Sequence, residues 1–188
     1  MTEPAPGPAD YARACVGCYV AGRHAPQAPD APLYARRAAC FVTLKKHGEL
    51  RGCIGTLEPA ATTLGAEIAQ NARSSALRDP RFPPVSAEEY DALTFSVDVL
   101  SPSEPCALAD LDPMHWGVIV QAGGRRGVLL PALEGIDTVQ AQVAIARQKA
   151  GISADEPFDV QRFTVVRYRE GDPPSPGSAA PTDLEADD

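Results

Sequence analysis

The chain has 188 residues, of which 44% are apolar and 22% are charged, which is ordinary for a globular protein of one domain or of one domain with a small lobe. Its formal net charge is −8, which disfavours nucleic acid as a partner, because proteins that neutralise phosphates usually carry a basic surface. Residues 183–188 supply four of the negative charges, so the part expected to fold is only mildly acidic.

The sequence shows no sign of export or membrane insertion. No apolar run approaches the ~20 residues that a membrane-spanning helix needs. The first ten residues, MTEPAPGPAD, have neither the basic nor the apolar stretch of a secretory signal peptide. Five cysteines are an odd number, and a chain of this size can bury a core without disulfides. We therefore expect a cytoplasmic protein with reduced thiols and no membrane contact.

The first half of the chain predicts a helix, a β-hairpin and a second helix. Residues 1–9 are rich in Pro, Ala and Gly and are expected to be a flexible tail, while Asp10 is the expected cap of a helix over residues 11–20. Two β-rich runs, at residues 39–44 and 50–54, flank a turn and indicate a hairpin. Thr62 or Thr63 opens a helix that runs to Ser75.

The second half predicts further antiparallel structure. Residues 79–84 (DPRFPP) must be a loop, because three prolines exclude regular structure, and residues 86–89 (SAEE) resemble a capping box that opens a short helical turn. Strand 93–100, a hairpin of residues 116–120 and 127–130, a helix over 138–150 and a last strand over 163–168 follow. Hairpins outnumber possible βαβ units, so the predicted fold is α+β with a mainly antiparallel sheet and packed helices.

The most informative segment is LRGCIGT, residues 50–56, in which Gly52 and Gly55 flank a strand cysteine. Glycine in a strand usually marks a bulge or a place where something approaches the backbone closely. Arg51 would favour the thiolate of Cys53, the form that attacks electrophiles. The alternative is that Cys53 is a small buried residue and that the glycines only permit tight packing.

A cysteine nucleophile usually needs a base, and the sequence offers no convincing one. His47 lies in the hairpin turn, up to ~20 Å of strand from Cys53. His115 can approach Cys53 only through the fold, so it is the candidate base of a thiol enzyme. The pair Cys15 and Cys18 lacks the second pair that a structural zinc site commonly has. We therefore predict neither a metal site nor a cofactor.

Asp79, Arg81 and Phe82 lie in the loop whose shape the prolines fix, which suits a preorganised binding site. Arg81 could form an anion-binding patch with Arg73 and Arg78. The alternative is structural: an Asp79–Arg81 pair would hold the loop, and Phe82 would fill a place in the core.

Several segments together resemble the AMMECR family, whose bacterial members are called AmmeMemoRadiSam system protein A. The resemblance covers roughly residues 10–170, with flexible tails expected at residues 1–9 and 171–188. Five ordered blocks carry it: LRGCIGT with the preceding FVTLKK, SALRDPRFPP at residues 75–84, FSVDVL at 95–100, RGVLLP at 126–131 and KAG at 149–151.

The resemblance implies an α+β fold with a main antiparallel sheet, packed helices and a smaller lobe. It also implies association with a Memo-like protein, which resembles metal-dependent dioxygenases, and with a radical SAM protein. Carried over to this sequence, the functional candidates are Arg51, Gly52, Cys53, Ile54 and Gly55, with Asp79, Arg81 and Phe82 beside them.

Three functions follow for these candidates. The first is an accessory subunit that docks a Memo-like metalloprotein, or a small-molecule ligand shared with it, in a groove around the LRGCIG hairpin. The second is a thiol-dependent enzyme that uses Cys53 with Arg51 and His115. The third, nucleotide or RNA binding, rests on the arginines alone.

Overall fold

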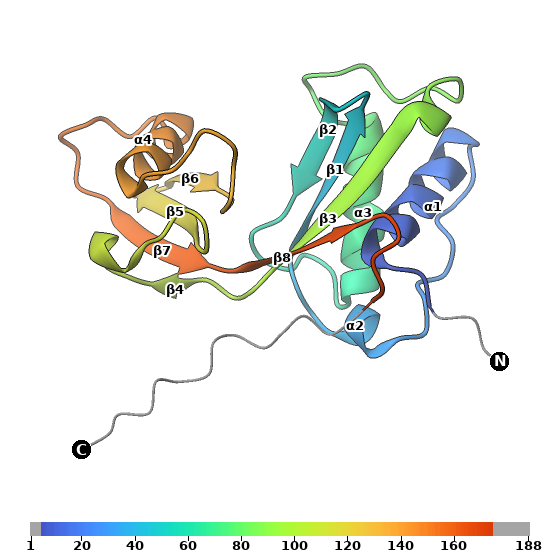
Figure 1. Ribbon diagram of the computed structural model, residues 1–188, viewed down its shortest axis with the longest axis horizontal. Coiled ribbons are helices and arrows are strands. Elements are labelled where there is room, and N and C mark those ends of the chain that lie inside the picture. Colours follow the sequence, from blue (N-terminus) through green and yellow to red (C-terminus); the bar gives the residue numbers. More distant parts are fainter. Residues whose placement is uncertain (1–4, 175–188) are drawn as a thin grey trace. The chain divides into compact units, whose positions relative to one another are not determined.

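The computed structural model describes residues 5–174, and these form two compact units with separate cores. Unit 1 takes Met1–Val99 and Val166–Asp188, and the smaller unit 2 takes Leu100–Val165. Each unit has a four-stranded sheet with antiparallel pairings and at least one packed helix (Figure 1). The predicted α+β class with a mainly antiparallel arrangement and a smaller lobe is confirmed.

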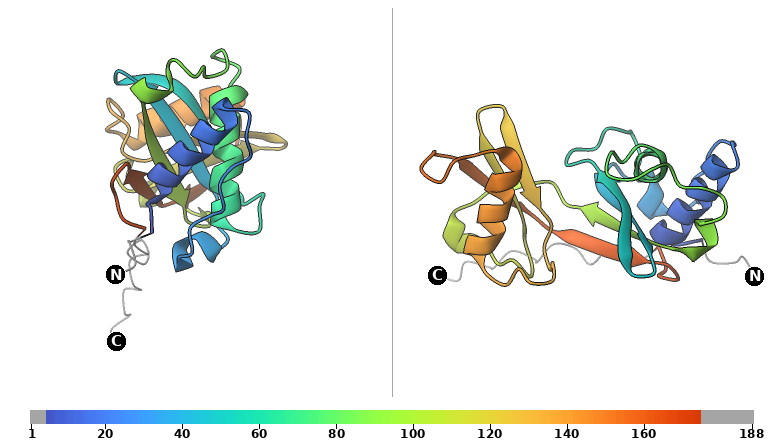
Figure 2. Two further views of the ribbon diagram at one scale, coloured as in Figure 1. Left: turned by 90° about the vertical axis from the view of Figure 1, so that its right-hand side faces the viewer. Right: turned by 90° about the horizontal axis from the view of Figure 1, so that it is seen from above.

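The sheet of unit 1 has the strand order β2-β1-β3-β8. Its strands are β1 (Cys40–Lys46), β2 (Glu49–Gly55), β3 (Leu93–Leu100) and β8 (Val165–Arg169). Its helices are α1 (Pro8–Val20), α2 (Pro32–Ala35) and α3 (Leu64–Leu77), with a 3-10 turn η1 (Tyr90–Ala92) before β3. Helix α3 packs on β1 and β2, and α1 packs beside α3, so that both helices cover the same face of the sheet (Figure 2).

The β1–β2 hairpin forms where the sequence predicts it. Val42 and Leu44 of β1 are fully buried against the helices, while Phe41 and Thr43, which alternate with them, are half-buried, as expected for a strand with one face on a core. His47 and Gly48 make the turn with φ of 52° and 86°, the positive values that a tight two-residue hairpin turn requires. The register shifts between Leu44 and Lys45, so that a β-bulge leaves Arg51 without an opposite residue.

Unit 2 has the strand order β4-β7-β5-β6. Its elements are β4 (Glu104–Pro105), the 3-10 turn η2 (Leu108–Asp110), β5 (Gly117–Ala122), β6 (Arg125–Leu129), α4 (Val139–Ala150) and β7 (Asp159–Phe163). Helix α4 packs on β5 and β6. It begins after Thr138, whose side chain accepts a bond from the Ala141 N–H, and it ends at Gly151 with φ of 64°, so both of its predicted ends are confirmed.

Three local predictions differ from the structure. Helix α1 begins at Pro8, not after Asp10, because proline suits the first position of a helix, where no N–H is needed. The expected last strand is two strands, β7 and β8, interrupted at Thr164. Residues 86–89 make the predicted bond from the Ser86 N–H to Glu89 and lead into a helical turn, but this turn is the 3-10 helix η1 at residues 90–92.

Parts of the two expected tails, residues 1–4 and 175–188, lie outside the described residues. Between residues 5 and 174, no helix combines the length and the apolar character that crossing a membrane would require.

Candidate functional site

The glycines of the LRGCIG segment lie where the protein's own atoms approach strand β2. A Cβ atom on Gly52 would be 2.3 Å from the carbonyl oxygen of Ser75 in α3. A Cβ atom on Gly55 would be 2.3 Å from the ring of Phe41 in β1. Both distances are far below van der Waals contact, so packing alone requires glycine at these positions. The close approach that the sequence indicated is made by α3 and β1.

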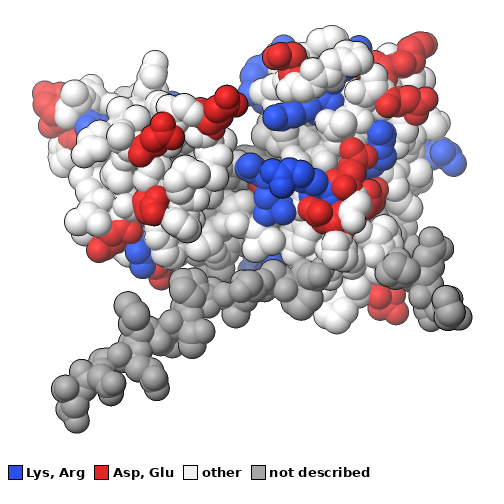
Figure 3. Space-filling model, in the orientation of Figure 1, with Lys and Arg blue, Asp and Glu red and all other residues white. Residues whose placement is uncertain are grey.

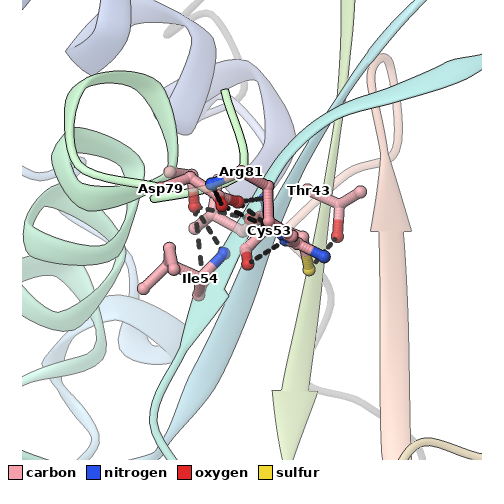
Figure 4. Close-up of polar contacts among 7 residues, drawn as sticks. Thr43, Cys53, Ile54, Asp79 and Arg81 are labelled. Atoms are coloured by element: carbon pink, nitrogen blue, oxygen red, sulfur yellow. Dashed lines mark hydrogen bonds and ion pairs between the residues drawn. The ribbon is translucent and has the colours of Figure 1, made fainter. Parts of the chain in front are cut away.

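The thiol of Cys53 is half-buried and lies opposite Thr43 of β1. Its sulfur is 3.2 Å from the Thr43 hydroxyl oxygen (Figure 4). Burial raises the pKa of the Cys53 thiol above its ordinary value, while the hydrogen bond to Thr43 and the charge of Arg81 act in the opposite direction. At neutral pH the favoured form is therefore the neutral thiol, and not the thiolate that a nucleophile requires.

The guanidinium of Arg51 binds Glu89. Its Nε and Nη2 donate to the Glu89 carboxylate at 3.1 and 2.6 Å, and Nη2 also donates to the carbonyl oxygen of Pro83 at 2.9 Å. Lys46 adds a third cationic contact to Glu89 at 3.1 Å. Arg51 thus ties the hairpin to the segment that follows the proline-rich loop, and the expected activation of Cys53 by Arg51 receives no support from this geometry.

Glu89 is the residue of this site that sequence reasoning missed. Its side chain is 13% exposed, and the hydrogen bonds from Arg51, with smaller contributions from the Ser86 N–H and Lys46, lower its pKa to about 2. The sequence signal for Glu89 was the SAEE pattern, which predicts that its carboxylate accepts a hydrogen bond from the Ser86 N–H. That pattern describes the bond to Ser86, but it contains no information on a partner 38 residues away.

The side chains of Asp79 and Arg81 bind the backbone N–H and carbonyl oxygen of Cys53 from outside the sheet. Asp79 accepts the Cys53 N–H at 2.9 Å, and Arg81 donates to the Cys53 carbonyl oxygen at 3.1 Å (Figure 4). The two side chains form a bidentate ion pair at 2.9 and 2.7 Å, which lowers the pKa of Asp79 well below its usual range. Because β2 is an edge strand, the pair satisfies groups that a further strand would otherwise bind.

Phe82 does not enter the core. Its ring is half-buried, and the guanidinium carbons of Arg51 and Arg81 lie 5.8 and 5.5 Å from its centroid, within cation–π range. Val85 fills the core position instead, with 5% of its surface exposed. The Asp79–Arg81 ion pair therefore exists as expected. The core position expected for Phe82 is filled by Val85.

Helix α3 holds the inner side of the hairpin through Ser75. The Ile54 N–H donates to the Ser75 hydroxyl at 2.8 Å, and this hydroxyl donates to the carbonyl oxygen of Val42 at 2.7 Å. One buried side chain therefore bridges β2 and β1. Ile54, a predicted binding residue, contributes its backbone to this contact.

The remaining candidates make contacts of their own or lack the partners that their chemistry needs. His115 belongs to unit 2, where its exposed ring lies 2.7 Å from the Asp112 carboxylate. Cys15 is fully buried, and burial raises its thiol pKa to about 12. Among residues 5–174, no group of three or more His, Cys, Asp and Glu side chains is gathered in a way that could hold a metal ion.

A third ion pair, whose aspartate is buried, lies on the face of the sheet that carries Cys53. Asp98 of β3 accepts from Nε and Nη2 of Arg167 in β8 at 2.6 and 3.0 Å. Thr43 pairs with both Cys53 and Ser96, and Ser96 and Asp98 are two residues apart, so all of them project from this face, which lies opposite the helices. We call it the outer face. Figure 3 shows basic side chains gathered over the strands of unit 1, with acidic side chains beside them.

Comparison with known proteins finds the same fold and sequence pattern in other organisms. The model of the AMMECR1 family matches residues 9–171. A Thermotoga maritima protein is 53% identical over 140 residues, covering 73% of this chain and 80% of that protein. A Methanocaldococcus jannaschii protein is 34% identical over 179 residues, covering 87% and 88%.

A crystal structure of an uncharacterized protein from Pyrococcus horikoshii has a TM-score of 0.79 and 31% identity, and the match covers 88% of this chain and 91% of that one. The family model and the structural match therefore both cover most of the chain. The chain belongs to the AMMECR1 family.

Proposed function

We propose that the chain is an accessory subunit that docks a Memo-like metalloprotein, and acts with a radical SAM protein, through the surface around the LRGCIG hairpin. The observation that carries this proposal is the rigid support of β2 on both sides. Ser75 binds it from the helix side, and the Asp79–Arg81 pair binds it from the open edge. A backbone fixed in this way loses little conformational entropy on binding.

The hairpin also exposes side chains suited to a partner. Leu50 keeps 41% of its surface exposed, one of few large apolar side chains so placed among the described residues. The side chain of Arg81, which donates to the carbonyl oxygen of Cys53 in β2, is 51% exposed. Arginine is enriched at protein interfaces, and an arginine already held by an ion pair loses little side-chain entropy on binding. A small ligand shared with the partner would use the same surface.

The two alternative functions receive less support. A thiol enzyme needs an accessible thiolate and a base, whereas burial favours the neutral form of Cys53 and His115 is bound to Asp112. Nucleotide or RNA binding needs free cationic side chains, whereas Arg51, Arg81 and Arg167 are each paired with a carboxylate.

A co-purification experiment tests docking. The purified chain and the Memo-like protein of the same organism are mixed and passed through a size-exclusion column, with Leu50→Ser as the test variant. We expect the wild-type chain to co-elute with the partner and Leu50→Ser to lose most of the complex. Leu108→Ser is the matched control, since Leu108 is 49% exposed but belongs to unit 2. Failure of the wild-type chain to co-elute, or an equal loss with both variants, would contradict the proposal.

A further inference from the structure

A cleft in unit 2 lies between the 3-10 turn η2 and helix α4. Its volume is about 630 Å³, and small-molecule sites in proteins have volumes of roughly 300–1,000 Å³. Leu111 and Val143 are its most buried lining residues, each 7% exposed. Val139 and Phe158 also line it and are half-buried against the same core. The cleft therefore reaches the hydrophobic core of unit 2, and its lining is mainly apolar.

Helix α4 supplies one wall of this cleft as a row of side chains. Val139, Val143 and Arg147 all line the cleft, and they follow one another at intervals of four residues, which places them on one side of the helix. At a rise of 1.5 Å per residue, Arg147 lies about 6 Å along the helix axis from Val143 and about 12 Å from Val139. The wall is thus apolar along most of its length and has a cation at one end.

The guanidinium of Arg147 is held in place but is not neutralised. Its central carbon lies 4.6 Å from the ring centroid of Phe158, and its Nη2 donates to the carbonyl oxygen of Ser153. Within residues 5–174, no carboxylate forms an ion pair with Arg147. The nearby carboxylate of Glu156 is bound by Arg125, so the charges of Arg125, Glu156 and Arg147 sum to +1. Among the described residues that line the cleft, Arg147 is the one with a charge.

This combination of an apolar wall and an unpaired cation selects the ligand. Covering the apolar lining is favourable for any apolar body of suitable size. A guanidinium has five N–H donors, of which the Ser153 carbonyl oxygen takes one, so Arg147 can still bind a carboxylate through charge-assisted hydrogen bonds. A compact anion such as phosphate would leave the apolar lining uncovered, and a neutral apolar molecule would leave Arg147 unpaired.

We propose that the cleft between η2 and α4 binds a small carboxylic acid with an apolar body. The carboxylate lies on Arg147, and the body covers Leu111 and Val143. The cleft belongs wholly to unit 2, so this inference is independent of docking at the LRGCIG hairpin of unit 1.

Three probes with one apolar body and different charges test the site: phenylbutyrate, phenylbutanol and phenylbutylamine. The full chain is titrated with each, and the leucine and valine methyl signals and the arginine Nε–H signals are followed by NMR at constant ionic strength. We expect saturable shifts at Leu111 and Val143 with phenylbutyrate, about tenfold weaker binding of phenylbutanol, and still weaker binding of phenylbutylamine. The Arg147 Nε–H signal should respond most to phenylbutyrate.

Two variants separate the charge from the cavity. Arg147→Gln should bind phenylbutyrate about tenfold more weakly and phenylbutanol unchanged, a difference that general damage to the cleft would not produce. Lys149→Gln is the matched control, because Lys149 is an exposed cation of the same helix that contacts the Val128 carbonyl oxygen and does not line the cleft. Ala144 is an exposed lining residue, so Ala144→Phe should fill the cleft and weaken both probes without removing a core side chain.

Three results would overturn the inference. They are phenylbutyrate shifts that do not saturate, phenylbutyrate binding no tighter than phenylbutanol, and unchanged phenylbutyrate affinity in a folded Ala144→Phe chain. All three use the chain without a partner protein, so the docking proposal can hold while the cleft proposal fails.

Discussion

At the residue scale, Cys53 shows how a neighbourhood changes the chemistry of a side chain. An arginine two positions away in a strand would favour a thiolate if its charge faced the sulfur. In the structure the charge of Arg51 is directed to Glu89, and burial of the thiol outweighs the effects of Thr43 and Arg81 on its pKa. The reactivity of Cys53 should therefore be lower than that of an ordinary exposed cysteine.

Alkylation measures this directly. We expect iodoacetamide to modify Cys53 more slowly in the folded chain than in the urea-unfolded chain at neutral pH, with a pH midpoint above the ordinary thiol value, because burial favours the neutral form. Thr43→Val removes a hydrogen bond that lowers the pKa, so its midpoint should rise further. Peptide mapping by mass spectrometry identifies Cys53 among the five cysteines. A pH midpoint of Cys53 alkylation below that of the unfolded chain would contradict this prediction and favour the thiol-dependent enzyme.

Gly52 is the residue whose replacement should damage the hairpin most directly. Gly52→Ala places a carbon 2.3 Å from the Ser75 carbonyl oxygen, so α3 or β2 must shift. We expect a loss of about 1–3 kcal/mol in the free energy of unfolding, measured by urea denaturation. Gly124→Ala is the control, since it meets nothing within 4 Å and should change stability little. Equal effects of the two substitutions would refute the packing explanation.

At the element scale, β2 is an edge strand that side chains stabilise in place of a neighbouring strand. The Asp79–Arg81 pair binds the Cys53 backbone, and Arg51 binds Pro83 in the loop and Glu89 beyond it. Edge strands with free backbone groups are prone to unwanted pairing. The proline-rich loop thus completes the hairpin and occupies the edge of β2 at Cys53.

Acid should loosen this connection through Glu89. Its pKa is lowered from 4.5 to about 2 in the folded protein, so its ion pair stabilises the fold fully above pH 4.5 and the contribution is lost as pH falls toward 2. Glu89→Gln should therefore be less stable than wild type in urea at pH 7, and the difference should shrink between pH 4.5 and 2. Glu49→Gln, at an exposed glutamate of β2, the strand that contains Arg51, is the control. A pH-independent difference would contradict this assignment.

At the scale of the whole molecule, each unit carries its own hydrophobic core. The core of unit 1 lies between its sheet and helices α1 and α3, and the core of unit 2 lies between its sheet and α4. Leu44 and Leu129 belong to the two cores and are 0% and 4% exposed. Damage to one core should therefore act first on the unit that contains it.

Hydrogen exchange can resolve the two units. Leu44→Ala should cost about 2–5 kcal/mol and raise amide exchange mainly in unit 1, and Leu129→Ala should do so mainly in unit 2, because each substitution leaves a cavity in one core. Leu108→Ala, at an exposed position, should change neither. If Leu44→Ala raised exchange equally in both units, the chain would behave as a single cooperative unit.

The sequence by itself determined the elements whose signals are local. The β1–β2 hairpin follows from alternating apolar residues around a turn, and α4 follows from Thr138 and Gly151 at its ends. The proximity of the loop to the hairpin came from the family resemblance, and the structure shows how Asp79 and Arg81 make that contact. Helix and strand periodicity depend on near neighbours, which is why they can be read directly.

Only the tertiary structure decided the partners of the charged and polar groups. Glu89 lies 38 residues from Arg51, and Arg167 lies 69 residues from Asp98, so no spacing rule connects them. The same holds for the protonation of Cys53, which depends on burial beneath residues from other strands. Ion pairs and desolvation act through space, and the energies that set them exist only once the chain has folded.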